Sequence, residues 1–518
     1  MIMSTAIQYH EATKYHPETV GNHPGLDWAK MPVPFKVWDT EAAVALAPYL
    51  PFDPNPFTGE AAGPEAVISD GLGLVSRWIY HTCGITALVP QEPRPLFLRA
   101  NPSAGGLYPA EIHLIAHGYA GLEDGLYGYD LQGHRLVPLW SGADIHAGLV
   151  EACYGNAAVA AAPLSLVVTG VFERSRWRYQ ERAYRRILLD AGHLIGNAGL
   201  AAHALGGRTH ATTAFADEAI ETVLRLDPDT EGALAVVSWS PGQGVSERPN
   251  WTALPSPTGP AQVDPPLLDA LHRQSRLPRQ RPALVARGET QELALEQRYG
   301  WSGGTALRAI AVPATSLAAP ATGVAPALSG LAGDPLGLIR TRRSARSFTG
   351  KSCSLAQLAE VLLAAIDPVE AGLGRQPAFD RSQLMTFVAV NAVDGLAPGV
   401  YYLAPDTFAL RLVRTVVQEQ MQAGVRFLCL GQDLGGDAAF VVVHTADLAA
   451  AVRANGDRAY RLLHLDAGII GQRLDLAAIG TGLGASGIGG FFDDHITDQL
   501  GVPREQAVVY LTCVGVPG

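Results

Sequence analysis

The sequence is poor in cysteine, with five in 518 residues, and no two of them lie closer than 70 positions apart. This spacing excludes the C-x-x-C pairs of zinc and redox sites, and it excludes a small disulfide-built domain. The first residues lack a basic segment followed by an apolar run, so we expect no signal peptide. His10, His16 and His23 are too loosely spaced to predict a metal site. We therefore expect reduced thiols, no bound metal and a cytoplasmic location.

Charged residues are also scarce, at 17% of the chain, and 38 Lys and Arg against 49 Asp and Glu give a net charge of −11. A nucleic-acid-binding protein normally carries a basic patch, which this balance argues against. Apolar residues reach 48%, which is too many for a disordered chain. Residues 309–333 carry no charge, but their three prolines predict a linker rather than a membrane helix.

What the sequence does contain is an internal repeat. Residues 182–192, RAYRRILLDAG, recur as residues 458–468, RAYRLLHLDAG, with eight of eleven positions identical. A Phe-x-Asp triplet at 215–217 recurs at 491–493 with the same offset. Two long copies of one unit do not form a solenoid. They indicate a fused dimer, in which one chain supplies both halves of a two-fold arrangement.

Each copy has the pattern of a mixed α+β fold. The β-branched runs at 166–171 and 440–443 predict buried strands. The repeated segment opens a long apolar helix in each copy, over 187–205 and 462–479. Small residues in these helices, such as Gly192, would let another helix approach closely, so we expect the two long helices to form the core of the dimer-like arrangement.

We therefore expect an α+β protein built from two tandem modules that form an intrachain pseudo-dimer. The predicted divisions are an N-terminal extension over 1–49, a first module over 50–245, a Pro-rich connector over 246–334 and a second module over 335–518.

A cluster of arginines is the sharpest local motif. Arg342, Arg343, Ser344 and Arg346 lie just before a helix that we expect to be capped by Ser354. Guanidinium groups match phosphate oxygens bidentately, so the cluster predicts a phosphate site. A solvated basic stretch is the alternative, although the acidity of the rest of the chain makes this local concentration more telling.

A second motif is a tight turn that precedes a predicted strand. It contains Asn101, Pro102, Ser103, Ala104 and Gly105, followed by a second glycine. Pro-Ser and Gly-Gly allow such a turn to bring its backbone and hydroxyl close to a flat ligand. An ordinary loop remains the alternative.

A third motif is the glycine-rich segment 482–490, GLGASGIGG, which formally matches G-x-G-x-x-G. The dinucleotide fingerprint must follow a strand and open a helix, whereas this segment follows the helix predicted over 462–479. We therefore reject a dinucleotide site. Instead, Gly487, Ile488, Gly489 and Gly490 are predicted to let the backbone approach a planar ring.

Together these motifs resemble the nitroreductase superfamily of FMN proteins. The resemblance rests on RRS-x-R at 342–346, NPS-x-GG at 101–106, the repeated helix motif at 182–193 and Val-Gly-Val-Pro at 514–517. Within the superfamily the chain is most similar to SagB-type dehydrogenases, which oxidise azolines to azoles in thiazole- and oxazole-modified peptides. The resemblance covers nearly the whole chain except the connector.

The resemblance implies that a flavin lies at the dimer interface and is held by both modules. Residues 342–346 and 487–490 occur only in the second module. Their first-module counterparts, residues 52–59 and 211–214, contain neither the arginines nor the glycines.

Conversely, the 101–106 turn belongs to the first module, and the matching stretch near 376–380 has lost it. Because the losses are complementary, we expect one complete FMN site per chain and one dead pseudo-site.

The resemblance also implies a Lys-Tyr pair that handles protons just before the repeated helix. This sequence has Arg178 and Tyr179 there, and the second module has Asn455 and Gly456. Arginine is always protonated and cannot act as a base. Tyr179 would then need a depressed pKa, which we expect Arg178 and Arg182 to provide. The alternative for Tyr179 is a packing aromatic at a helix start.

Other polar residues of the first long helix carry weaker predictions. His193 and Asn197 share one helix face and could line the pocket, or they could be satisfied core residues. Asp190 and Arg182 persist in both modules. Because only one of the two sites is expected to work, residues kept in both modules indicate structural ion pairing. We therefore leave Asp190 and Arg182 out of the predicted site.

The resemblance thus implies an FMN-dependent dehydrogenase that converts azolines to azoles in a ribosomally made peptide, with O2 as electron acceptor. An NAD(P)H-dependent nitro- or quinone reductase and a non-catalytic flavoprotein scaffold are the alternatives. The implied partners are the modified precursor peptide and a cyclodehydratase complex, which the N-terminal extension could contact. A monomeric pseudo-dimer and a homodimer are both compatible with the repeat.

Overall fold

In the computed structural model, each copy of the repeat folds around one seven-stranded antiparallel sheet. The first sheet has the strand order β1-β6-β5-β4-β7-β9-β8, and the second has the order β10-β15-β14-β12-β16-β18-β17. The two orders are the same strand for strand, so the copies share one topology. The structure describes residues 4–21, 25–49, 71–90, 95–242, 256, 266–282, 300, 304–311, 334–366, 383–405, 407–503 and 505–518.

The strands of the first copy are β1 (Val44–Ala45), β2 (Ile85–Val89), β3 (Leu96–Arg99), β4 (Ala110–Ala116), β5 (Gly125–Asp130), β6 (Arg135–Ser141), β7 (Leu164–Val171), β8 (Gly207–Thr212) and β9 (Glu231–Pro241). Those of the second copy are β10 (Thr305–Ala306), β11 (Cys353–Ser354), β12 (Met385–Val390), β13 (Val393–Asp394), β14 (Gly399–Ala404), β15 (Ala409–Thr415), β16 (Phe440–Asp447), β17 (Gly484–Ile488) and β18 (Gln506–Gly515). β7 and β16 are buried along nearly their whole length, which confirms the strands predicted from their β-branched runs.

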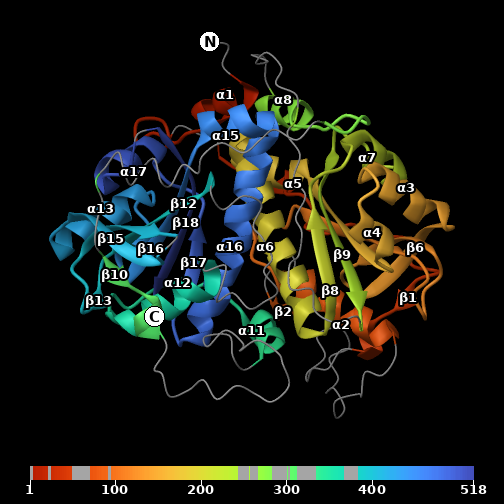
Figure 1. Ribbon diagram of the computed structural model, residues 1–518, viewed down its shortest axis with the longest axis horizontal. Helices are drawn as coiled ribbons and strands as arrows, with labels where there is room; N and C mark the ends of the chain where they lie inside the picture. Colours follow the sequence, from red (N-terminus) through yellow and green to blue (C-terminus); the bar gives the residue numbers. More distant parts are fainter. Residues whose placement is uncertain are drawn as a thin grey trace.

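The helices of the first half are α1 (Thr5–Ala12), α2 (Gly71–Cys83), α3 (Asp144–Ala152), α4 (Ala157–Ala161), α5 (Phe172–Tyr179), α6 (Ala183–Ala204), α7 (Asp217–Leu224) and α8 (Leu267–Gln274). The remaining ones are α10 (Arg308–Ala311), α11 (Pro335–Thr341), α12 (Leu355–Ile366), α13 (Gln418–Leu428), α14 (Asp433–Gly436), α15 (Leu448–Asn455), α16 (Ala459–Gly480) and α17 (Asp493–Leu500). Figure 1 shows α6 and α16 side by side at the centre of the molecule, with one sheet on each outer side.

The close approach of α6 and α16 depends on one glycine from each helix. A Cβ atom on Gly192 would lie 2.3 Å from the carbonyl oxygen of Leu465, and one on Gly468 would lie 2.3 Å from that of Leu189. Both distances are too short for a real contact, so only glycine fits at the crossing. The helix–helix core predicted from the small residues is therefore confirmed.

A buried ion cluster joins the start of α6 to the second copy. Arg182 donates to Asp493 over 2.9 Å, and Arg185 donates to the other oxygen of that carboxylate over 2.7 Å. Arg185 also donates to the Thr13 hydroxyl and to the His10 carbonyl, just after and within α1. The two arginines lower the pKa of Asp493 despite its burial.

An equivalent cluster joins the start of α16 to the first copy. Arg458 and Arg461 donate to the two oxygens of Asp217, over 2.8 and 2.7 Å. Arg461 also donates to the Ser275 hydroxyl and to the His272 carbonyl, in and after α8. We call these two clusters the arginine clamps. The expectation that Arg182 and its counterpart form structural ion pairs is thereby confirmed.

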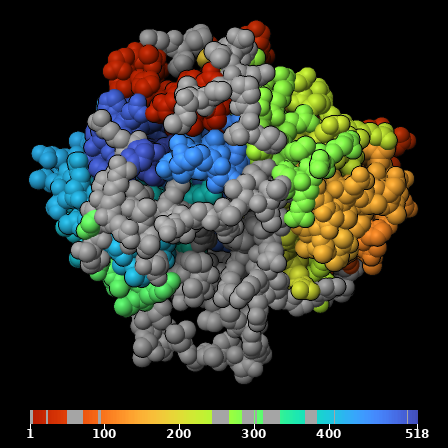
Figure 2. Space-filling view, turned by 45° about the horizontal axis from the view of Figure 1, so that its top comes forward, coloured from red at the N-terminus to blue at the C-terminus, as the bar shows by residue number. Residues whose placement is uncertain are grey.

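The clamps show that α1 and α8 are equivalent helices. His10 faces the Tyr460 hydroxyl from α1, and His272 faces the Tyr184 hydroxyl from α8. The two helices pack against each other over the N-terminal ends of α6 and α16 (Figure 1). Figure 2 shows the N-terminal segment (red) against the second copy (blue) and the α8 region (green) against the first.

The range 246–334, predicted as a connector, therefore includes the second copy of the leader helix. The sequences of α1 and α8 do not reveal this equivalence, because they share little beyond a histidine and a following hydroxyl residue. The predicted domain bounds otherwise stay predictions.

Some sequence predictions fall outside the described residues. These are the first-copy counterpart of the arginine cluster at 52–59, the second-copy counterpart of the turn at 376–380, residues 312–333 of the uncharged stretch, and His23. Within the described part of the chain, no helix is long and apolar enough to cross a membrane.

Candidate active site

The turn from Asn101 to Gly105 lies between β3 and β4 and is held by one carboxylate. Ser103 donates its hydroxyl proton to Asp190 over 2.5 Å, and the Ala104 amide donates to the same carboxylate over 3.3 Å. Gly105 has a φ of 65°, a conformation that favours glycine. The side-chain oxygen of Asn101 is buried and accepts no hydrogen bond from the residues that the structure describes. We call these five residues the Asn101 loop.

The prediction that Asp190 forms an ion pair is wrong. Its carboxyl accepts hydrogen bonds from the Asn101 loop, and no ion pair to it is found in the described part of the chain. Burial raises the pKa of Asp190 to about 7, against the opposing effect of these hydrogen bonds. Desolvation outweighs the hydrogen bonds here because the carboxyl is almost fully enclosed.

The arginine cluster follows a helix, which the sequence analysis did not predict. Asp334 caps α11 by accepting from the Gly337 amide, and Pro335 occupies the first turn. The cluster begins where α11 ends, and the next helix starts only at Leu355. The expectation that the cluster lies just before a helix is therefore wrong, although Ser354 does accept a hydrogen bond from the Gln357 amide as a cap.

Two guanidinium groups of the cluster reach across to the first copy. Arg342 is buried and donates to the Ala100 carbonyl over 3.0 Å and to the Ser344 hydroxyl over 3.3 Å. Arg343 donates to the Thr86 carbonyl over 3.0 Å.

These are uncharged acceptors, so the positive charge of Arg343 is not neutralised by them. Arg346 is exposed, and Arg342 has Asp475 as a carboxylate neighbour at 3.8 Å. The arginine cluster therefore braces the Asn101 loop and leaves cationic groups at its outer end.

The glycine segment, Gly487–Gly490, begins within β17 at the edge of the second sheet. β17 follows α16, so the rejection of a dinucleotide fingerprint is confirmed. The Ala345 amide donates to the Ala485 carbonyl over 2.8 Å, which ties the arginine cluster to this strand. A Cβ atom on Gly489 would lie 1.3 Å from a terminal nitrogen of Arg186.

Tyr179 is the last residue of α5 rather than the first of a helix. A Cβ atom on Gly105 would lie 2.9 Å from its hydroxyl oxygen, so the phenol lies directly against the Asn101 loop. The guanidinium carbon of Arg186 lies 4.9 Å from the ring centroid of Tyr179, and that of Arg178 lies 5.8 Å away.

The expected depression of the Tyr179 pKa is not found. Burial raises the pKa of Tyr179, and the opposing effects of Arg186 and Arg178 are smaller. Arg182 was expected to help lower this pKa, but it forms an ion pair with Asp493 instead.

The predicted site residues thus come together as a closed ring of contacts. The arginine cluster holds Ala100, directly before the Asn101 loop, and it also meets β17. The glycine segment meets Arg186. Arg186 lies over Tyr179, whose hydroxyl returns to the Asn101 loop. The members come from both copies, so the ring exists only where the copies meet.

Sequence reasoning missed Arg186. A signal was present, because Arg186 is one of the three positions that differ within the repeated helix motif and its counterpart is Leu462. By contrast, His193 and Asn197 are core residues. His193 bonds the Leu189 carbonyl, and Asn197 accepts from Gln472 across the helix crossing.

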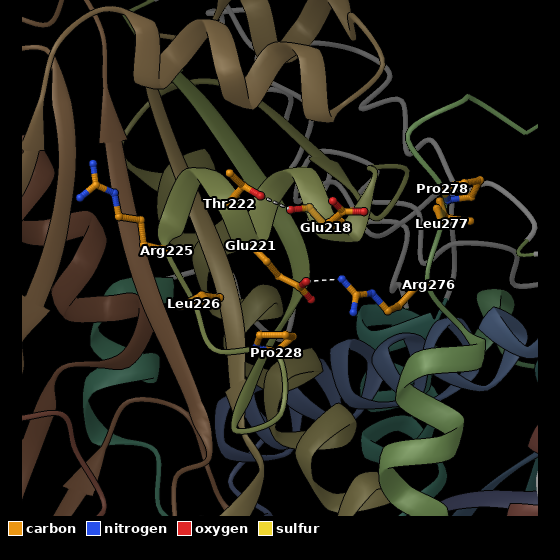
Figure 3. A pocket seen from close by; sticks show the side chains of 9 residues that line it. All are labelled: Glu218, Glu221, Thr222, Arg225, Leu226, Pro228, Arg276, Leu277 and Pro278. Carbon is orange, nitrogen blue, oxygen red and sulfur yellow. Dashed lines mark hydrogen bonds and ion pairs between the residues drawn. The ribbon is translucent and has the colours of Figure 1, made fainter.

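An open pocket lies elsewhere and contains none of these residues. It has a volume of about 720 Å³ and lies between α7 and the segment after α8 (Figure 3). Glu221 and Arg276 form an ion pair across it, and Thr222 donates to the Glu218 carbonyl on α7. The predicted site residues of both copies converge at the ring of contacts and not at this pocket.

Comparison with known proteins identifies the fold. A family model described as the nitroreductase family matches residues 86–238 and 339–516. The crystal structure of a protein from Anabaena variabilis assigned as a nitroreductase is 38% identical, and the superposition covers 100% of both chains with a TM-score of 0.85.

Two curated relatives match part of the chain. The trifolitoxin-processing protein TfxB of Rhizobium leguminosarum is 34% identical over 141 residues, which is 26% of this chain and 38% of TfxB. MJ1384 of Methanocaldococcus jannaschii, assigned as a nitroreductase, is 31% identical over 125 residues, which is 24% of this chain and 63% of MJ1384. The chain thus matches less than two thirds of each curated relative. With both modules matched by the family model, the chain belongs to the nitroreductase family and carries two nitroreductase modules in tandem.

Proposed function

We propose that this protein is an FMN-dependent dehydrogenase that oxidises azoline rings to azoles in a ribosomally made peptide, with O2 as electron acceptor. The observation that carries the proposal is the ring of contacts around Tyr179, Arg186, the Asn101 loop and the glycine segment. Its polar and glycine residues come from both copies, as a flavin held by two modules requires.

The residues of the ring fit a flavin. Arg186 is buried with a side-chain nitrogen that lacks a hydrogen-bond partner, and the side-chain oxygen of Asn101 is in the same position. The Arg186 guanidinium occupies the place that a Cβ atom on Gly489 would take, so the glycine lets this cation lie against the backbone. Unsatisfied buried polar groups of this kind are what a polar, planar ligand would complete.

Each motif then has a share in holding FMN. Arg343 and Arg346 would hold the phosphate, and the Asn101 loop and the glycine segment would hold the ring system. Bound FMN supplies a hydride acceptor. The protein's own residues align the substrate carbon, exclude water and move the proton that leaves the azoline.

Proton transfer is assigned to the hydroxyl oxygen of Tyr179. Because burial raises its pKa, the phenol is the resting form at neutral pH. Tyr179 can receive a proton only after releasing its own, which a neighbouring cation favours by stabilising the phenolate.

One working site per chain follows from differences between the copies. Asn455 stands where Tyr179 stands, and Ser256 packs against the adjacent Gly456 and accepts from the Arg458 amide over 3.0 Å. The equivalent place in the second copy therefore lacks the phenol and is contacted by Ser256. The partial likeness to TfxB, a trifolitoxin-processing protein, supports a peptide as the substrate and a biosynthetic complex as the partner.

Flavin content tests the cofactor assignment first. We expect the purified protein to carry one FMN per chain, measured from flavin absorbance against protein concentration. Two FMN per chain would contradict the one-site argument, and a colourless protein that does not take up FMN would favour the scaffold alternative.

Anaerobic mixing then tests the reaction. An azoline-containing peptide should bleach the flavin, and admission of O2 should restore its colour with formation of peroxide. Rapid bleaching by NADPH, with none by the peptide, would replace the proposal by a reductase.

Replacing Tyr179 with Phe should abolish turnover, because the substitution removes the hydroxyl that moves the proton. FMN content should remain at the wild-type level, since the aromatic ring is kept. Unchanged turnover in Tyr179→Phe would remove this residue from the mechanism.

A further inference from the structure

Arg186 is an unusual arginine because it is buried and unpaired. Its side chain lies on α6 with 5% of its surface exposed. Across the described ranges of the chain, its guanidinium forms no ion pair and no hydrogen bond, and its Nε atom is enclosed without a partner. A buried charge without a partner is costly, so its retention requires a reason.

The neighbours of Arg186 suggest the reason why a buried arginine is kept here. Its guanidinium lies over the ring of Tyr179, with the guanidinium carbon 4.9 Å from the ring centroid. On its other side it reaches the backbone of Gly489. Arg186 therefore connects the proton-handling residue of the first copy with the second copy.

Arg178, the cation that adjoins Tyr179 in the sequence, is placed differently. It is exposed, and its guanidinium carbon is 5.8 Å from the ring centroid. An exposed charge is screened by water and salt, whereas a buried one acts through a lower effective dielectric constant. Arg186 is thus both closer to the phenol and less screened.

We propose that Arg186, rather than Arg178, is the cation that enables Tyr179 to ionise during turnover, and that Arg186 is a positioning residue for proton transfer. The inference deepens the proposed function and rests on it. The charged and titratable groups that influence Tyr179 are Arg186 and Asp190 from α6, Arg178 from α5 and Tyr15 from the segment after α1. Of these, the two arginines lower its pKa, and the effect of Arg186 is the larger.

The second copy supplies a variant that should fold. The position equivalent to Arg186 carries Leu462, which is buried in α16 in the same helical setting. Arg186→Leu therefore introduces a residue that this chain already accommodates at the equivalent place. Arg186→Lys keeps the charge, and Arg178→Leu removes the exposed cation as the matched comparison.

The direct experiment measures the pKa of Tyr179 in flavin-free protein. Tyrosinate absorbance near 295 nm is titrated for each variant with and without Tyr179→Phe, and the difference isolates Tyr179. We expect Arg186→Leu to raise the pKa of Tyr179 by about 1 or more, since an opposite charge within about 6 Å typically shifts a pKa by that amount. Arg178→Leu should raise it less, and Arg186→Lys should keep most of the wild-type value.

The pH profile of azoline oxidation gives the second readout. Because Tyr179 must lose its proton, the rate should rise with pH towards its pKa, and Arg186→Leu should move this rise to higher pH. An equal or larger pKa increase in Arg178→Leu, or none in Arg186→Leu, would overturn the inference. If the titration behaves as expected but no azoline is oxidised, the proposed function fails while the assignment of Arg186 to Tyr179 stands.

Discussion

The two copies agree at their arginine clamps and differ one residue later along the same helices. Arg185 and Arg461 occupy equivalent places and each donates to an aspartate of the other copy. The next residue is Arg186 in α6 and Leu462 in α16. The first of these two positions is an arginine bound to an aspartate in both copies. The second is an arginine in the first copy and an uncharged leucine in the second.

The comparison separates residues that hold the molecule together from residues that serve one site. Each arginine clamp joins one copy to the other, and both clamps are present. Tyr179, Arg186 and Gly489 belong to the ring of contacts, which is the proposed site, and their counterparts are Asn455, Leu462 and Thr213. Duplication within one chain therefore provides an internal control for each residue of the candidate site.

The largest effect is expected from the clamps. Asp493→Asn should lower the free energy of unfolding by about 3–5 kcal/mol, because two buried guanidinium groups lose their counter-charge. Asp217→Asn should cost a similar amount for the same reason. Urea denaturation measures both. A large difference between the two variants would break the equivalence of the clamps.

The next largest effect is expected at the glycine segment, where the two copies differ in sequence. Gly489→Ala places a Cβ atom 1.3 Å from the Arg186 nitrogen, so the guanidinium has to move. We expect FMN affinity to fall by about tenfold or more, the equivalent of roughly one lost charge-assisted hydrogen bond.

The matched control for Gly489→Ala is Thr213→Ala at the equivalent position of the first copy. It should leave FMN affinity unchanged, as measured by flavin fluorescence titration. Equal losses in both variants would show that the second place also binds flavin, and the comparison would then fail.

The smallest effect is a change in the pH dependence of stability. The pKa of Asp190 is about 7 in the folded chain, above its unfolded value near 3.9. The folded state therefore binds more protons between these values, and this residue's contribution to stability decreases as pH rises through about 4 to 7. Asp190→Asn removes that contribution.

The difference in melting temperature between wild type and Asp190→Asn should thus change between pH 5 and pH 8, in favour of the variant at the higher pH. Glu221 and Asp475, whose pKa values are also raised, to about 7 and about 6, cancel in this difference. A constant offset across the range would show that Asp190 titrates normally.

The repeat made most of the fold predictable. Identity at 182–192 and 458–468 located the two central helices, and Gly192 predicted their close crossing. The Asn101 loop, the arginine cluster and the glycine segment were recognisable because loops that bring the backbone close to a ligand need particular residues. Their convergence across the two copies could be expected only from the resemblance.

What could not be predicted depends on burial and partners. The pKa of Tyr179 follows from enclosure that no spacing reveals, and Asp190 turned from an ion-paired residue into the support of a loop. The equivalence of α1 and α8 is carried by backbone carbonyls that receive the clamp arginines, such as those of His10 and His272. Backbone acceptors leave little trace in a sequence.

The clamps also set an order for biosynthesis. Asp493 follows Arg185 by 308 residues, so it leaves the ribosome about 15 to 60 s later at ordinary translation rates. During that interval the first copy has two arginines and an aspartate whose counter-charges have not been synthesised. Both clamps can therefore form only after the second copy has been synthesised.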